Sequence, residues 1–203
     1  MVFSESYLCQ PIAEFISFHH PGKIKPELNH PQFATLTTGR PKQVDFALLT
    51  PNAADVECVI ESKWISDSPY SKQAILDDLL RLECFRDPNR YVSRYFLVGG
   101  LIDHFNTNFL GLRFRDADTN NPFTPVFLDS TWGATTKTID VYSSTGNLRK
   151  FFRKFHAHYS IDLPKKFKTT LISRSRIDRI AVYLWKIESV KNRQTFAAAL
   201  PAW

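Results

Sequence analysis

The sequence predicts an α/β protein with a mixed β-sheet flanked by helices, and its hydrophobic patterning and its composition support this class. Short runs rich in β-branched and aromatic residues, typical of strands, alternate with longer stretches whose apolar residues recur at helical spacing. A length of 203 residues and a hydrophobic content of 43% suit one globular domain. We expect a core over about residues 1–115 and a C-terminal elaboration over about residues 116–203, which holds a basic helix and a hairpin.

The predicted elements follow one another along the chain from the N-terminal helix to the C-terminal strands. They are a helix over 7–18, a loop over 23–31, strands over 32–36, 44–49 and 58–64, a helix over 70–85, a strand over 95–101, a helical segment over 103–114, a loop over 115–125, a helix over 147–159, and strands over 167–174 and 179–188. The helix over 70–85 has the clearest period, with an apolar stripe on one side and a polar row on the other.

The second and third predicted strands are separated by the turn-forming stretch Thr50–Asp55, so the simplest pairing is an antiparallel hairpin centred near Ala53. This register places Asp45 opposite Glu61. Side chains alternate along a strand, so Lys63 shares the face of the two carboxylates. Carboxylates this close repel each other unless a proton or a cation lies between them, and a hard divalent ion would resolve the repulsion. The ammonium of Lys63 is placed to hold a water or to stabilise developing negative charge.

This Asp…Glu-x-Lys arrangement resembles the PD-(D/E)xK nuclease superfamily, which has the restriction-endonuclease-like fold. The resemblance implies that Asp45 and Glu61 hold Mg²⁺ or Mn²⁺ with help from the Ser62 carbonyl, and that Lys63 activates water against a phosphodiester. Residue 44 is Val where the family pattern has Pro, at a position where family members vary. The predicted order of helix, strands, Asp, Glu-x-Lys, helix and strand is the family's core order, so the expected fold is restriction-endonuclease-like.

The same resemblance suggests further site residues on two helices. An acidic residue on the first helix often reaches the metal in this family, and Glu14 is the best match, with Glu5 behind it. On the helix that follows the Glu-x-Lys strand, Gln73 is the candidate to face the active site and Arg81 the candidate to contact a phosphate. The structural alternatives stay open at this point: a solvated carboxylate at Glu14, and a solvated helix face with an Asp77–Arg81 pair.

Positive charge gathers in the C-terminal part of the chain. The net charge is +6, and between Arg149 and Arg193 there are thirteen Lys or Arg against three Asp or Glu. Such an asymmetry is typical of a protein that binds a phosphate backbone. The predicted contacts lie on the helix over 147–159, around its apolar stripe: Arg149, Lys150, Arg153 and Lys154. The expected partner is nucleic acid, with DNA favoured.

Three functions stay open from the sequence. The first is a metal-dependent endonuclease that hydrolyses phosphodiester bonds in nucleic acid. The second is a non-catalytic nucleic-acid-binding module on the same fold, and the third is a protein-interaction subunit. Because the hairpin places the two charged residues in a surface cleft, we expect Glu61→Gln and Lys63→Ala to abolish cleavage and to leave thermal stability nearly unchanged.

Composition also predicts the environment of the chain. No stretch approaches the roughly 18 apolar residues of a transmembrane helix, and no charged-then-apolar leader stands at Met1–Glu5. Cys9, Cys58 and Cys84 lack C-x-x-C spacing, which favours free thiols in a reducing cytoplasm over disulfides or zinc. We therefore expect a cytoplasmic protein without membrane contact, and a homodimer is an open expectation.

Overall fold

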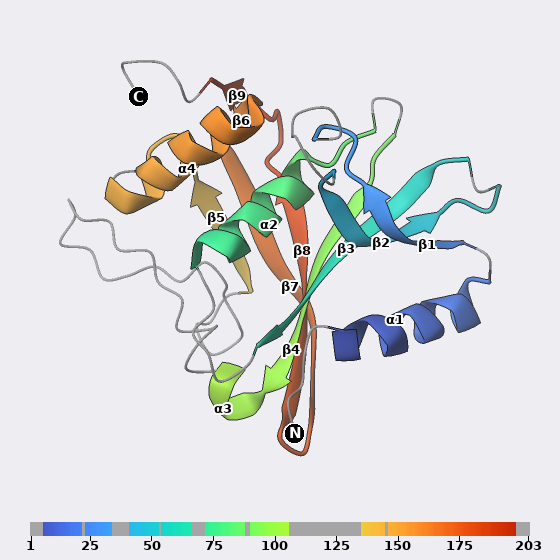
Figure 1. Ribbon diagram of the computed structural model, residues 1–203. Helices are drawn as coiled ribbons and strands as arrows, with labels where there is room; N and C mark the ends of the chain where they lie inside the picture. The colour runs from blue at the N-terminus through green and yellow to red at the C-terminus, as the bar shows by residue number, and fades with distance from the viewer. Residues whose placement is uncertain are drawn as a thin grey trace.

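The computed structural model describes residues 6–21, 23–33, 41–52, 54–65, 72–87, 90–105, 135–144 and 146–197. Its helices and strands are, in chain order, α1 (Ser6–His19), β1 (Ile24–Asn29), β2 (Gln43–Leu49), β3 (Val56–Ile65), α2 (Lys72–Cys84), β4 (Ser93–Leu101), α3 (Ile102–His104), β5 (Thr136–Asp140), α4 (Gly146–Tyr159), β6 (Leu163–Pro164), β7 (Lys166–Ile177), β8 (Ile180–Ser189) and β9 (Thr195–Phe196). Seven strands form one mixed sheet in the order β1-β2-β3-β4-β8-β7-β5, and β6 pairs with β9 (Figure 1).

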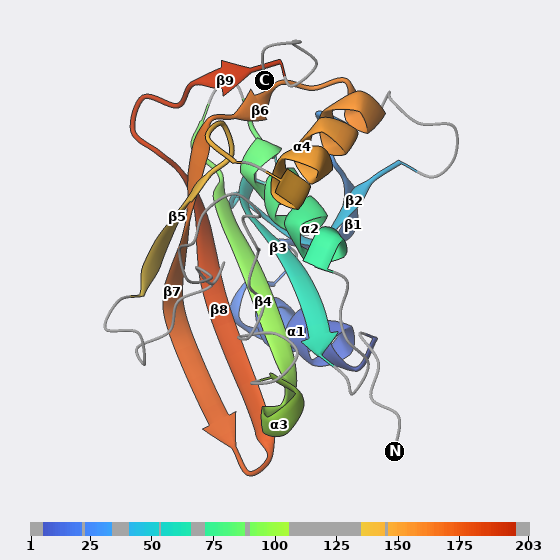
Figure 2. The ribbon, with the colours of Figure 1, turned by 90° about the vertical axis from the view of Figure 1, so that its left-hand side faces the viewer.

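The first half of this sheet has the order of elements that the sequence predicted. Strands β1, β2 and β3 form an antiparallel meander, α2 follows, and β4 returns parallel to β3. Strand β8 then pairs antiparallel with β4, and β7 and β5 extend the sheet. Helices α2 and α4 lie over one face and α1 over the other (Figures 1 and 2). The predicted α/β class, a mixed sheet flanked by helices, is confirmed at this level.

Helix α2 is held on the sheet by the apolar stripe that the sequence shows. Ile75, Leu76, Leu79 and Leu80 are all buried, on the side of α2 that meets β3, β4 and β8. Burial of one large aliphatic side chain stabilises a fold by about 1.5–3 kcal/mol, so this stripe fixes which side of the helix faces the strands. The rotation of α2 then decides which of its charged residues reach β3.

The C-terminal end of α2 is tied to the neighbouring strands by a buried carboxylate. Glu83 is fully buried, and Arg193 binds it through two bonds of 2.9 Å each. The hydroxyl of Ser189 on β8 donates to the same carboxylate at 2.8 Å, and Arg94 on β4 donates to the Glu83 carbonyl at 2.7 Å. These bonds join α2, β4 and β8 at one end of the sheet and hold the helix in register with the strands.

Two expectations for the first half of the chain were wrong. The loop predicted over 23–31 contains β1. A strand was predicted over 32–36, but Gln32 and Phe33 lie in a turn. Residues 34–36 fall outside the described part. β1 pairs with β2 only, as an edge strand, where Pro26 removes no bond from a second neighbour. Lys25, Pro26 and Glu27 are exposed, so this strand lacks the apolar alternation that would have revealed it.

The C-terminal half contains the basic helix and the hairpin that the sequence predicted, as α4 and β7–β8. Strands β5, β6 and β9 were not predicted. A helical segment was expected over 103–114, and the structure describes its start as α3 and Phe105. Residues 106–134 lie outside the described part, and so does the loop expected over 115–125. No helix in the described residues is long and apolar enough to cross a membrane.

Candidate functional site

The β2–β3 hairpin has the register that the sequence predicted, and its pairing ends beside Asp45. Phe46 pairs with Ile60, and continuing the same register by one residue places Asp45 opposite Glu61. The next backbone donor along β3, the N–H of Ser62, donates at 2.7 Å to Asp45 Oδ2, and the Ser62 hydroxyl donates to the same oxygen at 2.8 Å. The Asp45 carboxylate is thus fixed where the two strands separate.

Glu61 and Lys63 lie side by side on the face of β3 that α2 covers. Lys63 Nζ is 3.4 Å from Glu61 Oε1. The two residues are only 4% and 9% exposed, respectively. The expectation of a surface cleft was therefore wrong, because the stripe of α2 brings that helix down over this part of β3. Substitutions at these positions act on buried charges and are expected to change stability.

Helix α2 contributes three further charged residues to this cluster, Asp77, Asp78 and Arg81. Arg81 Nη2 donates to Glu61 Oε1 at 3.0 Å and also pairs with Asp78. The other oxygen of that aspartate, Asp78 Oδ2, lies 3.4 Å from Lys63 Nζ. It is buried and has no hydrogen-bond partner among the described residues, since the ammonium is near it without bonding geometry. The cluster therefore contains a carboxylate oxygen with unused bonding capacity.

The structure places Arg81 inside the protein rather than on the solvated row predicted for it. The side chain is 7% exposed. Its Nε donates to Asp77 Oδ2 at 3.2 Å and its Nη1 donates to the Gln43 carbonyl at 3.0 Å. The Asp77–Arg81 pair that the sequence left open is present, but Arg81 also bridges α2 to β2 and, through Glu61, to β3.

Glu14 and Gln73 are not brought into this cluster. Glu14 is exposed on α1, where it accepts a hydrogen bond of 2.9 Å from Gln10, and α1 lies on the sheet face opposite to α2 (Figures 1 and 2). Gln73 is exposed near the start of α2. Glu5 lies outside the described residues. The sequence did not predict the role of Asp78, a residue next to the polar row of Gln73, Asp77 and Arg81. The packing of α2 turns the Asp78 side chain towards Lys63 on β3.

The cluster holds more negative than positive charge. With every group ionised, the four carboxylates of Asp45, Glu61, Asp77 and Asp78 face three cations and leave a net charge of −1. The cations are Lys63, Arg81 and, beside Asp77, Lys42. Burial is the largest effect on Glu61 and, together with the Asp78 carboxylate, raises its pKa to about 8 against the opposing charge of Arg81. Burial also raises the pKa of Asp77. A proton on Glu61 or an added cation offsets this excess of negative charge.

The donor set fits a hard divalent ion in its chemistry. Carboxylates from β2, β3 and α2 converge, and oxygen ligands are the ones that Mg²⁺ and Mn²⁺ prefer. Among the residues that the structure describes, no group of three or more His, Cys, Asp or Glu side chains is arranged to hold an ion. The physical reason lies in the ion pairs, because Arg81 and Lys63 are the partners of Glu61 and Asp78. Arg81 and Lys63 both bind Glu61 Oε1, so an ion at that oxygen would compete with them.

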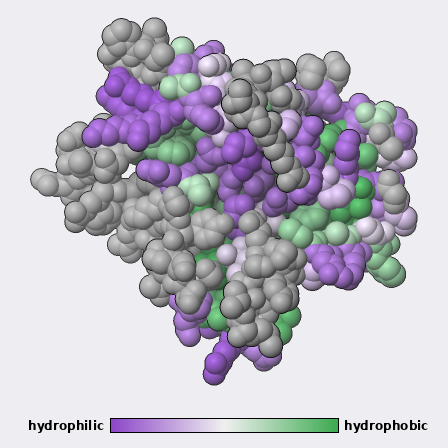
Figure 3. All heavy atoms as spheres, viewed as in Figure 1, coloured by the Kyte–Doolittle hydropathy of each residue, from purple (hydrophilic) through white to green (hydrophobic). Residues whose placement is uncertain are grey.

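The predicted basic residues of α4 divide into two groups. Arg149 is partly buried and donates through Nε to the Ser144 carbonyl at 2.7 Å, near the start of the helix. Lys150, Arg153 and Lys154 are exposed on the outer side of α4, away from the sheet, where hydrophilic residues cover the upper left of Figure 3. Contact of these residues with nucleic acid stays a prediction.

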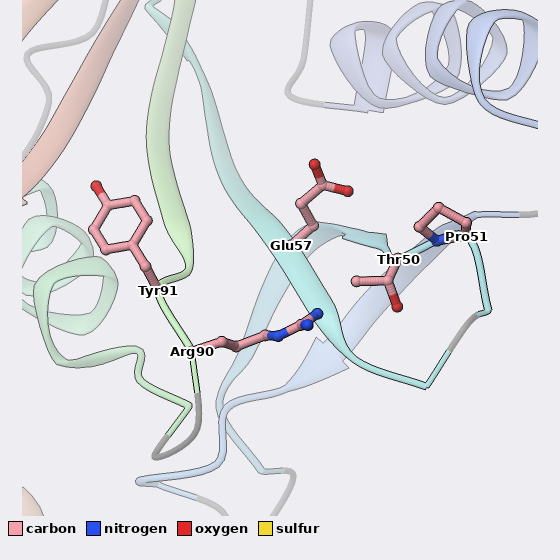
Figure 4. Close-up of a pocket in the computed structure, with 5 residues that line it drawn as sticks. All are labelled: Thr50, Pro51, Glu57, Arg90 and Tyr91. Atoms are coloured by element: carbon pink, nitrogen blue, oxygen red, sulfur yellow. The ribbon is translucent and has the colours of Figure 1, made fainter.

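A separate cavity of about 390 Å³ lies at the turn end of the β2–β3 hairpin (Figure 4). It is lined by Thr50, Pro51, Glu57, Arg90 and Tyr91. The Arg90 guanidinium already forms a 3.2 Å ion pair with Asp55. None of the predicted site residues is in the described lining, so this cavity is separate from the charged cluster.

No protein-family model, no curated protein and no solved structure matches this chain. The function is therefore argued from the geometry and charge of the residues described above.

Proposed function

We propose that this chain is a metal-dependent nuclease that hydrolyses phosphodiester bonds in nucleic acid, with DNA as the favoured substrate, on a restriction-endonuclease-like core. One observation carries the proposal: Asp45, Glu61 and Lys63 come together at the point where β2 and β3 separate, in a cluster that holds more negative than positive charge. The order α1–β1–β2–β3–α2–β4 supports it, since this is the core order of the nuclease superfamily that the motif resembles.

The ligands that we assign to Mg²⁺ or Mn²⁺ are the carboxylates of Asp45 and Glu61. Ser62 directs both of its donors to Asp45 Oδ2, which leaves Oδ1 to coordinate an ion. Asp78 offers a third carboxylate, and its Oδ2 is buried without a hydrogen-bond partner in the described residues. When bound, a divalent ion supplies Lewis-acid polarisation of a phosphate oxygen and acidifies a coordinated water.

Lys63 is the residue that we assign to the attacking water and the phosphate. Its ammonium lies 3.4 Å from both Glu61 Oε1 and Asp78 Oδ2, so two carboxylates hold it in place. Release of either carboxylate to an ion frees N–H donors of Lys63 without moving its anchor on β3. These donors then orient a water or stabilise the charge that develops on the phosphate.

Arg81 has a positioning role in this proposal. Its bonds to Asp77 and to the Gln43 carbonyl keep it anchored when Nη2 leaves Glu61. In the state described here, Arg81 and Lys63 supply the positive charge that an ion would otherwise supply. That observation favours a second candidate function, a non-catalytic nucleic-acid-binding module in which the two basic side chains permanently replace the metal.

Cleavage assays with purified chain distinguish these two functions. We expect Mg²⁺ or Mn²⁺ to permit cleavage of supercoiled plasmid or linear duplex DNA, EDTA to stop it, and added Mn²⁺ to restore it. Single-stranded DNA and RNA in parallel reactions define the substrate. The activity must disappear at the temperature at which the chain itself unfolds, which excludes a more stable contaminant. Salt-sensitive DNA binding without cleavage in either ion would select the non-catalytic module.

A further inference from the structure

The β7–β8 hairpin projects beyond the rest of the sheet, at the end where β3 and β4 finish (Figures 1 and 2). Residues 172–179 are all exposed. Arg174 and Arg176 lie on β7, and Arg179 lies in the two-residue turn beside Asp178, whose φ of 51° an aspartate tolerates. No ion pair with another described residue engages these three arginines. Hydrophilic residues cover this tip at the bottom of Figure 3. The projection is therefore a basic two-stranded ribbon with one acidic residue.

The pairing of the sheet places this ribbon in line with the charged cluster. Lys63 pairs with Val98, Val98 pairs with Tyr183, and Tyr183 pairs with Arg174. Residues that pair directly across strands point to the same face of a sheet. Arg174 therefore shares the face of Lys63, and three strand spacings of about 4.8 Å put the two about 14 Å apart.

The next row towards the tip repeats this arrangement. Ile65 pairs with Gly100, Gly100 with Ala181, and Ala181 with Arg176. Arg176 accordingly lies on the same face as Arg174. A cavity of about 290 Å³ is lined by Arg174, Ser175, Arg176 and Tyr183. The two guanidinium groups thus stand beside a hollow on the side of the sheet that carries the cluster.

We propose that this basic ribbon, residues 172–181, enters a groove of double-stranded DNA whose backbone runs across the same face towards Lys63. The inference rests on the proposed nuclease function, because that function defines which face the substrate occupies. The major groove of B-form DNA admits a two-stranded β-ribbon, whereas the major groove of A-form RNA is too narrow and deep for side chains to read. Arginine binds phosphate oxygens or a guanine edge through two parallel bonds.

The two exposed isoleucines of the ribbon also fit DNA better than a lipid surface. Ile177 is 70% exposed at the end of β7 and Ile172 is 51% exposed. Ser173 precedes Arg174 and Ser175 lies between Arg174 and Arg176. The apolar area is therefore small for membrane binding, which scales with buried apolar surface. An isolated isoleucine at the tip of a basic ribbon can contact a thymine methyl group or a base step in a groove.

The test compares two triple variants that each remove three positive charges from an exposed surface. The first is Arg174→Ala/Arg176→Ala/Arg179→Ala on the ribbon, and the second is Lys150→Ala/Arg153→Ala/Lys154→Ala on the outer side of α4. Duplex affinity is measured in EDTA across a salt series, so binding is read without cleavage. Substitutions at exposed positions usually change stability by less than about 0.5 kcal/mol, and matched thermal unfolding curves check that both variants fold.

The ribbon variant is expected to bind duplex more weakly and to flatten the slope of log affinity against log salt by about 2.7, because each phosphate contact contributes about 0.9. The α4 variant is expected to change the slope less, since its charges point away from the sheet. The inference would be overturned if both variants lost equal affinity, or if the ribbon variant kept the salt slope of the parent. It would also be overturned if the parent did not bind duplex DNA, or if the parent bound phosphatidylserine vesicles more tightly than duplex DNA through the ribbon.

A small substrate separates failure of this inference from failure of the nuclease proposal. Bis(p-nitrophenyl) phosphate carries a single phosphodiester, so a molecule bound at Lys63 has no second phosphate for Arg174 to bind. We expect the ribbon variant to hydrolyse it with Mn²⁺ at the parent rate while losing duplex cleavage, and Glu61→Gln to lose both activities. Loss of small-diester hydrolysis in the ribbon variant would show that these arginines act on the cluster itself, which contradicts a role in DNA binding. Ribbon-dependent duplex binding without hydrolysis in the parent would keep DNA binding by the ribbon and reject the nuclease, together with the path of the DNA towards Lys63.

Discussion

Glu61→Gln and Lys63→Ala are each expected to lower the rate of metal-dependent DNA cleavage by about 10²–10⁴-fold, the range in which a positioned proton-transfer group or charge contributes to catalysis. Glu61→Gln preserves the shape of the side chain but removes a charged metal ligand. Lys63→Ala removes the ammonium that two carboxylates hold at 3.4 Å and leaves both carboxylates in place. The two variants should therefore lose cleavage for different reasons.

Measurements of Mn²⁺ binding separate these reasons. Lys63→Ala should bind Mn²⁺ at least as tightly as the parent, because the cluster becomes more negative, whereas Glu61→Gln should bind it more weakly. Single-turnover cleavage at saturating Mn²⁺ and calorimetric titration of Mn²⁺ measure the two effects. The matched controls are Glu57→Gln, an exposed carboxylate on the same strand, and Lys25→Ala, an exposed lysine on β1. If both cluster variants cleave like these controls, the active site lies elsewhere.

The free energy of unfolding is expected to fall as the pH rises from about 4.5 to about 8, by an amount on the order of a few kcal/mol. Burial and the Asp78 carboxylate raise the pKa of Glu61 from 4.5 to about 8. In this window the folded chain binds the Glu61 proton and the unfolded chain does not, so stability is present at low pH and is lost as the proton leaves. Glu61→Gln should remove the contribution of this proton to the pH dependence.

The range between pH 6.5 and 8 gives the cleanest test of this prediction. Burial lowers the pKa of His30 from 6.5 to about 4, which makes stability rise with pH below 6.5 and opposes the contribution of Glu61 there. Chemical denaturation of the parent, Glu61→Gln and the Glu57→Gln control across this range isolates the Glu61 proton. Parallel pH profiles for the parent and Glu61→Gln would show that the buried carboxylate is ionised throughout. Added Mn²⁺ should stabilise the parent more at pH 8 than at pH 5, because it replaces the proton.

Local pattern was sufficient to predict how Asp45 and Glu61 approach each other. The turn-forming stretch Thr50–Asp55 fixes the centre of the hairpin, and the period of two residues then decides which side chains share a face. The same kind of signal was absent at β1, where Pro26 and its charged neighbours conceal an edge strand. Sequence patterns work where one face of an element is buried and the other is exposed.

The contribution of α2 could not be predicted because it depends on how the helix is rotated against the sheet. Asp77 and Asp78 are adjacent, and a rotation of one residue decides which of them meets Lys63. Arg81 lies in the predicted polar row, yet its long side chain reaches under the helix to Glu61. Likewise, the alignment of Arg174 with Lys63 arises from three strand pairings between segments far apart in the chain. Such contacts are set by tertiary packing, which short-range periodicity does not encode.

A crystal structure of the chain with Mn²⁺, at a concentration that supports cleavage, tests the central claim most directly. The claim is that Asp45 and Glu61 share a divalent ion in place of the Glu61–Arg81 pair. The predicted result is an anomalous scattering peak coordinated by both carboxylates, with Arg81 Nη2 withdrawn from Glu61 while its bond to Asp77 is kept. An intact Glu61–Arg81 pair, with Mn²⁺ bound only at other sites, would contradict it.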